Sequence, residues 1–185
     1  RDKRMKWSDF GGKCELKDNQ NPIYTASREF FEETSGSICS IYRMSKSFSS
    51  KNNICLKGKS YTNKNYYMFL VNIENILSKE NIDVILTEFD NCREFLGKLN
   101  YMDKKYLEKT KLKWISISQM YGDDAKEHLR QVFYNTIMID ENKAILSTII
   151  ANHHPKPTKK EQKEQLFVEY KKHKFMHISK VSKYI

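Results

Sequence analysis

The chain has 185 residues with a formal net charge of +10 at pH 7, and 39% of its residues are hydrophobic. This length suits one domain with an appendage. No apolar run approaches the roughly 20 residues of a membrane-spanning helix, and the first ten residues lack the apolar stretch of a signal peptide. We therefore expect a protein without a membrane partner, located inside the cell and most simply in the cytoplasm.

Two further features concern the setting of the chain. Its four cysteines form no CxxC pair and no metal-ligand spacing, so they indicate reduced thiols, as in an intracellular protein. The chain begins with Arg rather than Met, which suggests that part of the natural N-terminus is missing. No feature indicates an oligomeric state.

The predicted elements begin, after a basic extended start, with a helix at Asn21-Pro22. Asn is a good N-cap, and Pro suits the first helical position. Gly36 is suited to follow the end of this helix. Its inward face consists of apolar residues at helical spacing: Ile23, Ala26 and Phe30.

Strands are predicted next, over residues 38–50, 53–60 and 66–73. The stretch "YYMFLVNI" at 66–73 is apolar almost throughout, so we expect it to be buried on both faces. Residues 74–110 read as short helices and loops. "KLKWISIS" at 111–118 alternates polar and apolar residues, as a strand does.

An amphipathic helix is predicted over 123–137, with an inward face of Leu129, Val132, Phe133 and Ile137. Because helices and strands are interspersed, the fold class is α/β or α+β.

Positive charge is concentrated at the end of the chain. Residues 151–185 carry nine Lys and three Glu, a net charge of +6, whereas the first 150 residues carry +4. This favours a polyanionic partner such as RNA, DNA, polyphosphate or an anionic membrane, although a solvated lysine-rich helix would have the same composition. We expect a domain at 1–150 and a basic helical extension at 151–185. The candidate phosphate-binding residues are Lys156, Lys159, Lys160, Lys163, Lys171, Lys172 and Lys174.

The stretch "REFFEE" gathers negative charge in this basic chain. On a helix, Glu29, Glu32 and Glu33 lie on one side, and Arg28 stands four residues before Glu32, within reach of it. Like charges so close together are destabilising unless a cation or water screens them, and Mg²⁺ prefers such oxygen ligands. Taken alone, the stretch could equally be a solvated helix face.

The glycine pair Gly11-Gly12 adds a second feature. Without Cβ atoms, this backbone can turn sharply and approach the carboxylates, so that a carbonyl oxygen could serve the same metal. The combination of a glycine turn, a loop, a capped helix and clustered glutamates is more specific than any of its parts.

Residues 11–36 resemble the signature of the Nudix hydrolases, which runs Gly, five residues, Glu, seven residues, Arg-Glu-apolar-x-Glu-Glu-x-Gly-apolar. "REFFEE" matches it fully, and "WSDFGGK" at 7–13 is similar to the strand and turn that lead in. "LKWISIS" resembles a tryptophan-bearing strand late in that fold. The chain departs from the signature at Ser35, where the family has glycine, and at Gln20, where it has glutamate. Glu15 is the candidate substitute for that glutamate.

The resemblance implies an α/β/α sandwich with a mixed sheet and hydrolysis of a nucleoside diphosphate linked to another group. It also implies that Glu29, Glu32 and Glu33, with the carbonyl of Gly12, hold Mg²⁺ or Mn²⁺, and that Arg28 orients the glutamates. Many members have one more catalytic glutamate just before the late tryptophan strand. Glu108, six residues before Trp114, is the best candidate, and Glu88 and Glu94 are less well placed.

The resemblance leaves the substrate open. Joining a Nudix domain to a basic helix is similar to the mRNA-decapping branch, including enzymes of large DNA viruses, and capped RNA is then the partner. The alternatives are a small substrate, such as a dinucleoside polyphosphate or a diphosphoinositol phosphate, and a non-catalytic module that binds RNA. A methylated cap base would need an aromatic platform, for which the candidates are Trp7, Tyr61, Tyr66 and Tyr101.

Overall fold

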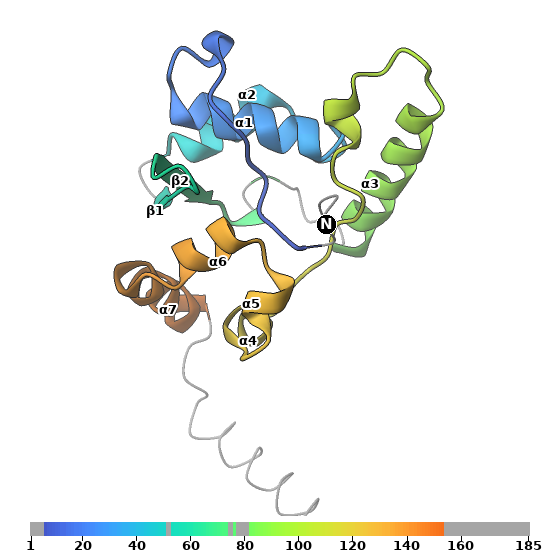
Figure 1. Ribbon diagram of the computed structural model, residues 1–185. Helices are drawn as coiled ribbons and strands as arrows, with labels where there is room; N and C mark the ends of the chain where they lie inside the picture. The colour runs from blue at the N-terminus through green and yellow to red at the C-terminus, as the bar shows by residue number, and fades with distance from the viewer. Residues whose placement is uncertain (1–5, 51–52, 74–75, 77–81, 154–185) are drawn as a thin grey trace, which may run out of the picture. The chain divides into compact units, whose positions relative to one another are not determined.

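The computed structural model describes residues 6–50, 53–73, 76 and 82–153 of the chain (Figure 1). These residues combine helices with a small antiparallel sheet and are broadly of the α/β class. The chain divides into two compact units, residues 1–142 and 143–185. The predicted domain boundary after residue 150 falls inside α7 (Asp140–His153), as does the boundary between these units.

The predicted first helix is confirmed as α1 (Pro22–Glu33), which follows a short 3-10 helix, η1 (Leu16–Asp18). The Asn21 side chain accepts hydrogen bonds from the N–H groups of the first turn, as an N-cap does. Gly36 follows the helix in a left-handed conformation, with φ of +68°. The predicted inward residues of α1 pack against a core cluster of Cys39, Met44, Phe48 and Ile76.

The predicted strand over 38–50 is wrong, because this stretch forms α2 (Ile41–Phe48). Ser40 caps the helix by accepting a hydrogen bond from the N–H of Arg43. Met44 and Phe48, four residues apart, are both buried in the core. Capping and a helical spacing of the buried residues therefore outweigh the strand-like composition.

The predicted strands at 53–60 and 66–73 are confirmed as β1 (Ile54–Lys59) and β2 (Asn65–Leu70), which pair in antiparallel register with Leu56 opposite Met68. The expectation that β2 is buried on both faces is wrong. Met68 is buried, but its neighbour Tyr67 is 40% exposed, because only one face of the hairpin is covered there. The described sheet has these two strands, fewer than the mixed sheet that the resemblance implies.

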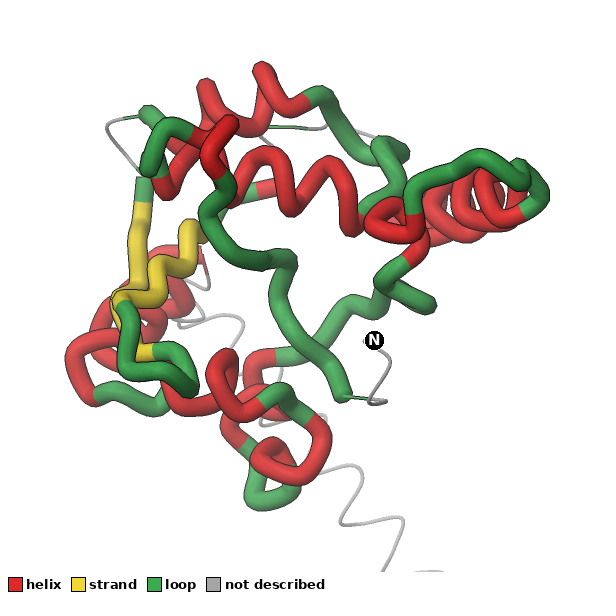
Figure 2. Tube along the Cα trace, turned by 45° about the horizontal axis from the view of Figure 1, so that its top comes forward, coloured by secondary structure: helices red, strands yellow, loops and turns green. Residues whose placement is uncertain are grey.

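The stretch 74–110, expected to mix short helices and loops, contains the 16-residue α3 (Ile82–Gly97) and the 3-10 helix η3 (Lys104–Leu107). Ile85 and Phe89, one helical turn apart, form the buried side of α3. In unit 1, α1 packs against α2, and η3 packs against both α1 and α3. Residues 8–15, which include Gly11 and Gly12 and are called the glycine segment below, run as an extended chain past α1 (Figure 2).

The predicted strand over 111–118 is wrong. Residues 111–116 are irregular, and α4 (Ile117–Tyr121) begins within the predicted strand. The side chains of Ser116 and Gln119 each accept a hydrogen bond from the backbone N–H of the other, which forms a capping box. This local start signal for a helix overrides the alternating pattern.

The predicted helix over 123–137 is divided into α5 (Ala125–His128) and α6 (Gln131–Ile137). The break occurs because the N-terminal segment pairs there: the Trp7 N–H donates to the carbonyl of His128, and the Arg130 N–H donates to the carbonyl of Trp7. Three of the four predicted inward residues are buried, and Phe133 is half-buried.

α6 packs against β1 and approaches it closely at Gly58. A Cβ atom at this position would lie 2.3 Å from Oγ1 of Thr136, so the missing side chain permits the contact. Among the described residues, no helix combines the length and apolar composition that a membrane span requires.

Candidate active site

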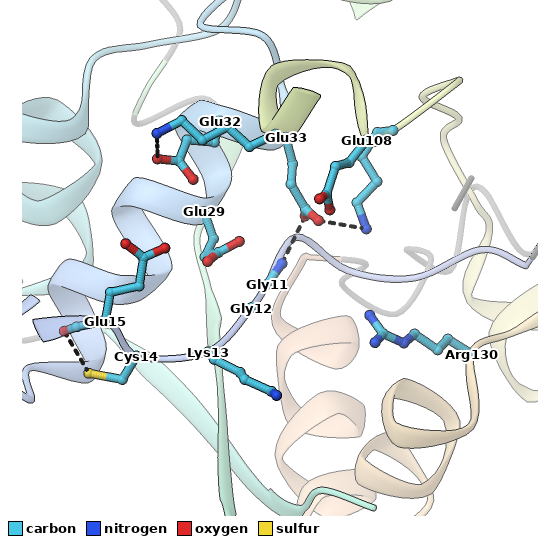
Figure 3. Close-up of a pocket in the computed structure, with 12 residues that line it drawn as sticks. Gly11, Gly12, Lys13, Cys14, Glu15, Glu29, Glu32, Glu33, Glu108 and Arg130 are labelled. Carbon is cyan, nitrogen blue, oxygen red and sulfur yellow. Dashed lines mark hydrogen bonds and ion pairs between the residues drawn. The ribbon is translucent and has the colours of Figure 1, made fainter. Parts of the chain in front are cut away.

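The glutamates of "REFFEE" lie on the last turns of α1 and face an open pocket of about 740 Å³ (Figure 3). The glycine segment, η3 with the residues that follow it, and the residue before α6 complete its wall. Its acidic lining residues are Glu15, Glu29, Glu32, Glu33 and Glu108. Its basic lining residues are Lys13, Lys105, Lys109 and Arg130. The structure thus brings the three predicted metal-binding glutamates, Glu108 and Gly12 to one pocket.

The glycine pair lies directly against the carboxylates. A Cβ atom on Gly12 would be 2.2 Å from Oε1 of Glu29, a separation that only a residue without a side chain permits. The Gly11 N–H donates a 2.9 Å hydrogen bond to Oε2 of Glu33. The sequence-based expectation that this backbone approaches the carboxylates is therefore confirmed.

Arg28 is buried behind the pocket and organises its acidic wall. Its Nη1 lies 2.8 Å from Oε1 of Glu29 and donates a 2.9 Å hydrogen bond to Oε2 of Glu32, which confirms the predicted pair. Its Nη2 also donates to the carbonyl of Lys13. One guanidinium therefore connects two turns of α1 with the glycine segment, which fits the expected orienting role.

Asp18 completes this arrangement and was not anticipated from the sequence. Its two carboxylate oxygens accept 2.9 Å hydrogen bonds from Nε and Nη2 of Arg28. Thr25 and the N–H of Glu15 also donate to it. These bonds, led by those from Arg28, lower the pKa of Asp18 to about 2.

Glu15, the expected substitute for the missing signature glutamate, contacts Arg28 less closely than Asp18 does. Its carboxylate is half-exposed and lies 3.4 Å from Nη1 of Arg28. Asp18 reaches Arg28 because Asn19 and Gln20 both have left-handed backbones, with φ of 51° and 58°, and reverse the chain. Spacing along the sequence does not reveal this reversal.

The Glu33 carboxylate is bound by Lys109 and by the Gly11 N–H. Lys109, itself buried, lies 3.1 Å from Oε1 of Glu33 and also donates hydrogen bonds to Ser8 and to the carbonyl of Asp9. Burial nevertheless raises the pKa of Glu33 to about 7, because the opposing effects of Lys109 and the Gly11 N–H are smaller. Burial likewise raises the pKa of Glu29, and the nearby charges of Glu32 and Glu108 act in the same direction.

Glu32, one of the three predicted metal ligands, is closely paired with two cationic side chains. Its carboxylate forms ion pairs of 2.9 Å with both Arg28 and Lys105. Among the described residues, no three His, Cys, Asp or Glu side chains already surround a point as metal ligands. Oxygen donors next to a bare glycine backbone are nonetheless the donor set that Mg²⁺ prefers, so the residues present fit this ion. Lysine ammonium groups now satisfy part of that set.

Glu108 is exposed and lines the pocket, whereas Glu88 and Glu94 do not. Two contacts of its neighbours hold this segment: Ser35 donates a 2.8 Å hydrogen bond to the carbonyl of Tyr106, and Nε of Arg93 donates to the carbonyl of Lys109. Ser35 has φ of 56°, in the region that glycine favours. Ser35, which stands where the signature has glycine, thus has a backbone conformation that glycine favours and adds a hydrogen bond to the segment that carries Glu108.

The aromatic platform candidates are dispersed. Tyr61 and Tyr101 are exposed, and Tyr66 donates a hydrogen bond to Asp9. Trp7 borders a separate apolar pocket of about 370 Å³, together with Trp114. The predicted lysine contacts at 156–174 lie outside the described residues.

Comparison with protein-family models, with curated proteins and with solved structures finds no match to this chain.

Proposed function

We propose that this chain is a Nudix-type hydrolase that uses a divalent cation to cleave a phosphoric anhydride, with capped RNA as its substrate. One observation carries the proposal. The "REFFEE" helix, the side-chain-free backbone of Gly12 and Glu108 meet in one open pocket, although they come from three separate parts of the sequence. A solvated helix face would not require this convergence.

The residues of the pocket can be given roles. Glu29, Glu32 and Glu33, with the Gly12 carbonyl, would hold Mg²⁺, which when bound would neutralise charge on the anhydride bridge. Arg28 fixes the orientation of Glu29 and Glu32 through its ion pairs. Glu108, an exposed residue that lines the pocket, would accept a proton from an attacking water.

The choice of capped RNA rests on the charge of the chain. The net charge of +6 over residues 151–185 suits a long phosphate backbone, which a small nucleotide would not need. A small anhydride is the second candidate, because a pocket of about 740 Å³ lies within the size range typical of small-molecule sites. An α/β/α sandwich with a mixed sheet remains the fold that we propose.

The first test is a substrate panel in the presence of Mg²⁺. Capped RNA of about 30 nucleotides, free cap dinucleotide, a diphosphoinositol phosphate and a nucleoside diphosphate sugar are incubated with the full chain, and the products are identified. We expect capped RNA to be cleaved fastest, because binding energy from the remote RNA can be used at the reacting bridge. Faster turnover of a small substrate would transfer the proposal to the second candidate.

The second test addresses the carboxylates. Glu33→Gln should lower kcat about 100-fold, a change of about 3 kcal/mol in the barrier, while the circular dichroism spectrum stays unchanged. Glu88→Gln, on α3 and outside the pocket, is the matched control. Wild-type Mg²⁺-dependent turnover in folded Glu33→Gln would remove the metal-site interpretation.

A further inference from the structure

Arg130 is a charged residue of the pocket that the signature does not explain. It directly precedes α6, and its backbone is fixed by the 2.7 Å hydrogen bond from its N–H to the carbonyl of Trp7. The side chain lines the pocket and extends from α6 toward Gly11 and Gly12 (Figure 3). In the sequence this position falls inside the predicted amphipathic helix over 123–137, where no role is expected of it.

The guanidinium of Arg130 lacks a protein partner among the residues that the structure describes. Its Nε is buried and donates no hydrogen bond, and within the same described ranges it forms no ion pair with a carboxylate. Two of the other pocket cations differ, because Lys105 is paired with Glu32 and Lys109 with Glu33. Asp9 attracts Arg130 electrostatically without forming an ion pair with it. A planar group of N–H donors therefore faces the pocket and is available to a ligand.

The pocket thus offers both signs of charge to a ligand. Glu29 and Glu108 can attract a cation, whereas Arg130 and the exposed Lys13 can attract an anion. A single ligand can use both when it is an anion that carries a divalent cation with it, as a chain of linked phosphoryl groups does. A guanidinium matches phosphate oxygens in a bidentate geometry.

We propose that Arg130 binds a phosphoryl group of the substrate. This inference rests on the proposed function, but it concerns binding and can be tested without turnover. Arg130 is here a substrate-binding residue, distinct from Arg28, whose guanidinium is buried in protein contacts.

The test is calorimetric titration of the full chain with methylenediphosphonate and Mg²⁺, a pair that cannot be hydrolysed. Arg130→Gln should weaken binding at least tenfold. Arg130→Lys keeps the charge but loses the planar set of N–H donors, so its affinity should lie between those of Arg130→Gln and the wild type. Lys98→Gln, an exposed charge change on the segment after α3, is the matched control and should bind as the wild type does. Equal affinities for Arg130→Gln and Lys98→Gln would overturn the proposal.

A second measurement uses the unmodified protein and so does not depend on the folding of a variant. Phenylglyoxal reacts with arginines, and peptide mapping gives the rate at each site. Methylenediphosphonate with Mg²⁺ should slow the reaction of Arg130 and leave that of Arg43, an exposed residue of α2, unchanged. Unchanged reactivity of Arg130 would contradict the proposal.

The binding role of Arg130 and the proposed hydrolase activity can fail independently of each other. Protection of Arg130 without hydrolysis of any substrate would keep the binding role and remove the proposed activity. Hydrolysis of capped RNA with wild-type kcat/KM in Arg130→Gln would keep the activity and remove the binding role.

Discussion

The backbone at Gly12 lies directly against the carboxylate of Glu29. Adding a side chain at Gly12 therefore tests whether the position of Glu29 matters for activity. In Gly12→Ala the new Cβ would lie 2.2 Å from Oε1 of Glu29, so Glu29 must move. Displacement of a catalytic group by about 1 Å can cost roughly 100-fold in rate, and we expect a loss of kcat of this order. The melting temperature should change little, because Gly12 is exposed.

The control for this substitution is Gly97→Ala at the end of α3. A Cβ atom there would meet nothing within 4 Å, so both activity and stability should be retained. Wild-type kcat in Gly12→Ala would show that Glu29 is not held in place by the glycine backbone.

Asp18 stabilises the site through Arg28, and its pKa predicts a pH dependence. The folded-state pKa is lowered from 3.8 to about 2, so this stabilisation is complete above pH 3.8 and is lost as the pH falls toward 2. The shift corresponds to about 2 kcal/mol. Asp18→Asn should cost about 3 kcal/mol at pH 7, because it leaves a buried guanidinium undercompensated, and the difference from wild type should shrink between pH 4 and pH 2.

Urea unfolding of wild type and Asp18→Asn across pH 2–7 measures this difference. Glu94→Gln is the control: it makes the same acid-to-amide change in an exposed ion pair with Lys98 and should leave stability almost unchanged. A constant gap between wild type and Asp18→Asn over the whole range would show that the Asp18 charge is not responsible.

At the scale of elements, the end of α1 is joined by side-chain contacts to η3 and the residues that follow it. Ser35 donates to the carbonyl of Tyr106, the rings of Phe31 and Tyr106 meet edge to face, and Lys105 and Lys109 pair with glutamates of α1. These contacts bring Glu108 to the pocket although it is distant from the helix in sequence. Its position therefore depends on packing rather than on a strand.

Glu108→Gln tests whether this positioning serves the reaction. Loss of a general base lowers the rate by roughly 100-fold or more, so we expect kcat to fall by about that factor while KM and the melting temperature change little. Glu88→Gln, on an exposed position of α3, should keep wild-type kcat. If Glu88→Gln lowered kcat more than Glu108→Gln does, the assignment of the general base to Glu108 would be wrong.

The elements that could be predicted are those whose signals are local. The start of α1 follows from Asn21 and Pro22, and its buried side follows from helical spacing. The stretch 111–118 could not be predicted from alternation, because a strand needs a partner strand and the Ser116 capping box starts a helix instead. The break before α6 depends on Trp7, at the opposite end of the described chain.

The same distinction holds for the site. The glutamates share a helix face, so their proximity is a local property that spacing predicts. The link from Asp18 to Arg28 crosses two left-handed residues, and the partnership of Lys109 with Glu33 joins segments distant in sequence. These contacts arise from the packing of loops, which leaves no periodic pattern in the sequence.

At the scale of the whole molecule, charge is divided unevenly along the chain. Residues 151–185 have a net charge of +6, whereas the candidate site lies within residues 1–142. If the terminal lysines bind the RNA backbone, affinity should depend on RNA length and on salt, whereas the chemistry at the pocket should not. Removal of residues 156–185 separates the two contributions.

We expect this deletion to weaken binding to a 30-nucleotide capped RNA much more than binding to cap dinucleotide. The slope of log K against log salt should fall by roughly one for each RNA phosphate that the protein no longer neutralises. A full-length variant with the seven candidate lysines replaced by Gln keeps the chain length and removes the charge, so it should reproduce the deletion if charge is the cause. The measurement is fluorescence anisotropy between 50 and 300 mM KCl, with hydrolysis of cap dinucleotide as a check that the pocket is intact. A salt slope equal to that of the wild type in both variants would show that these lysines only face solvent, and the preference for capped RNA would then lose its main support.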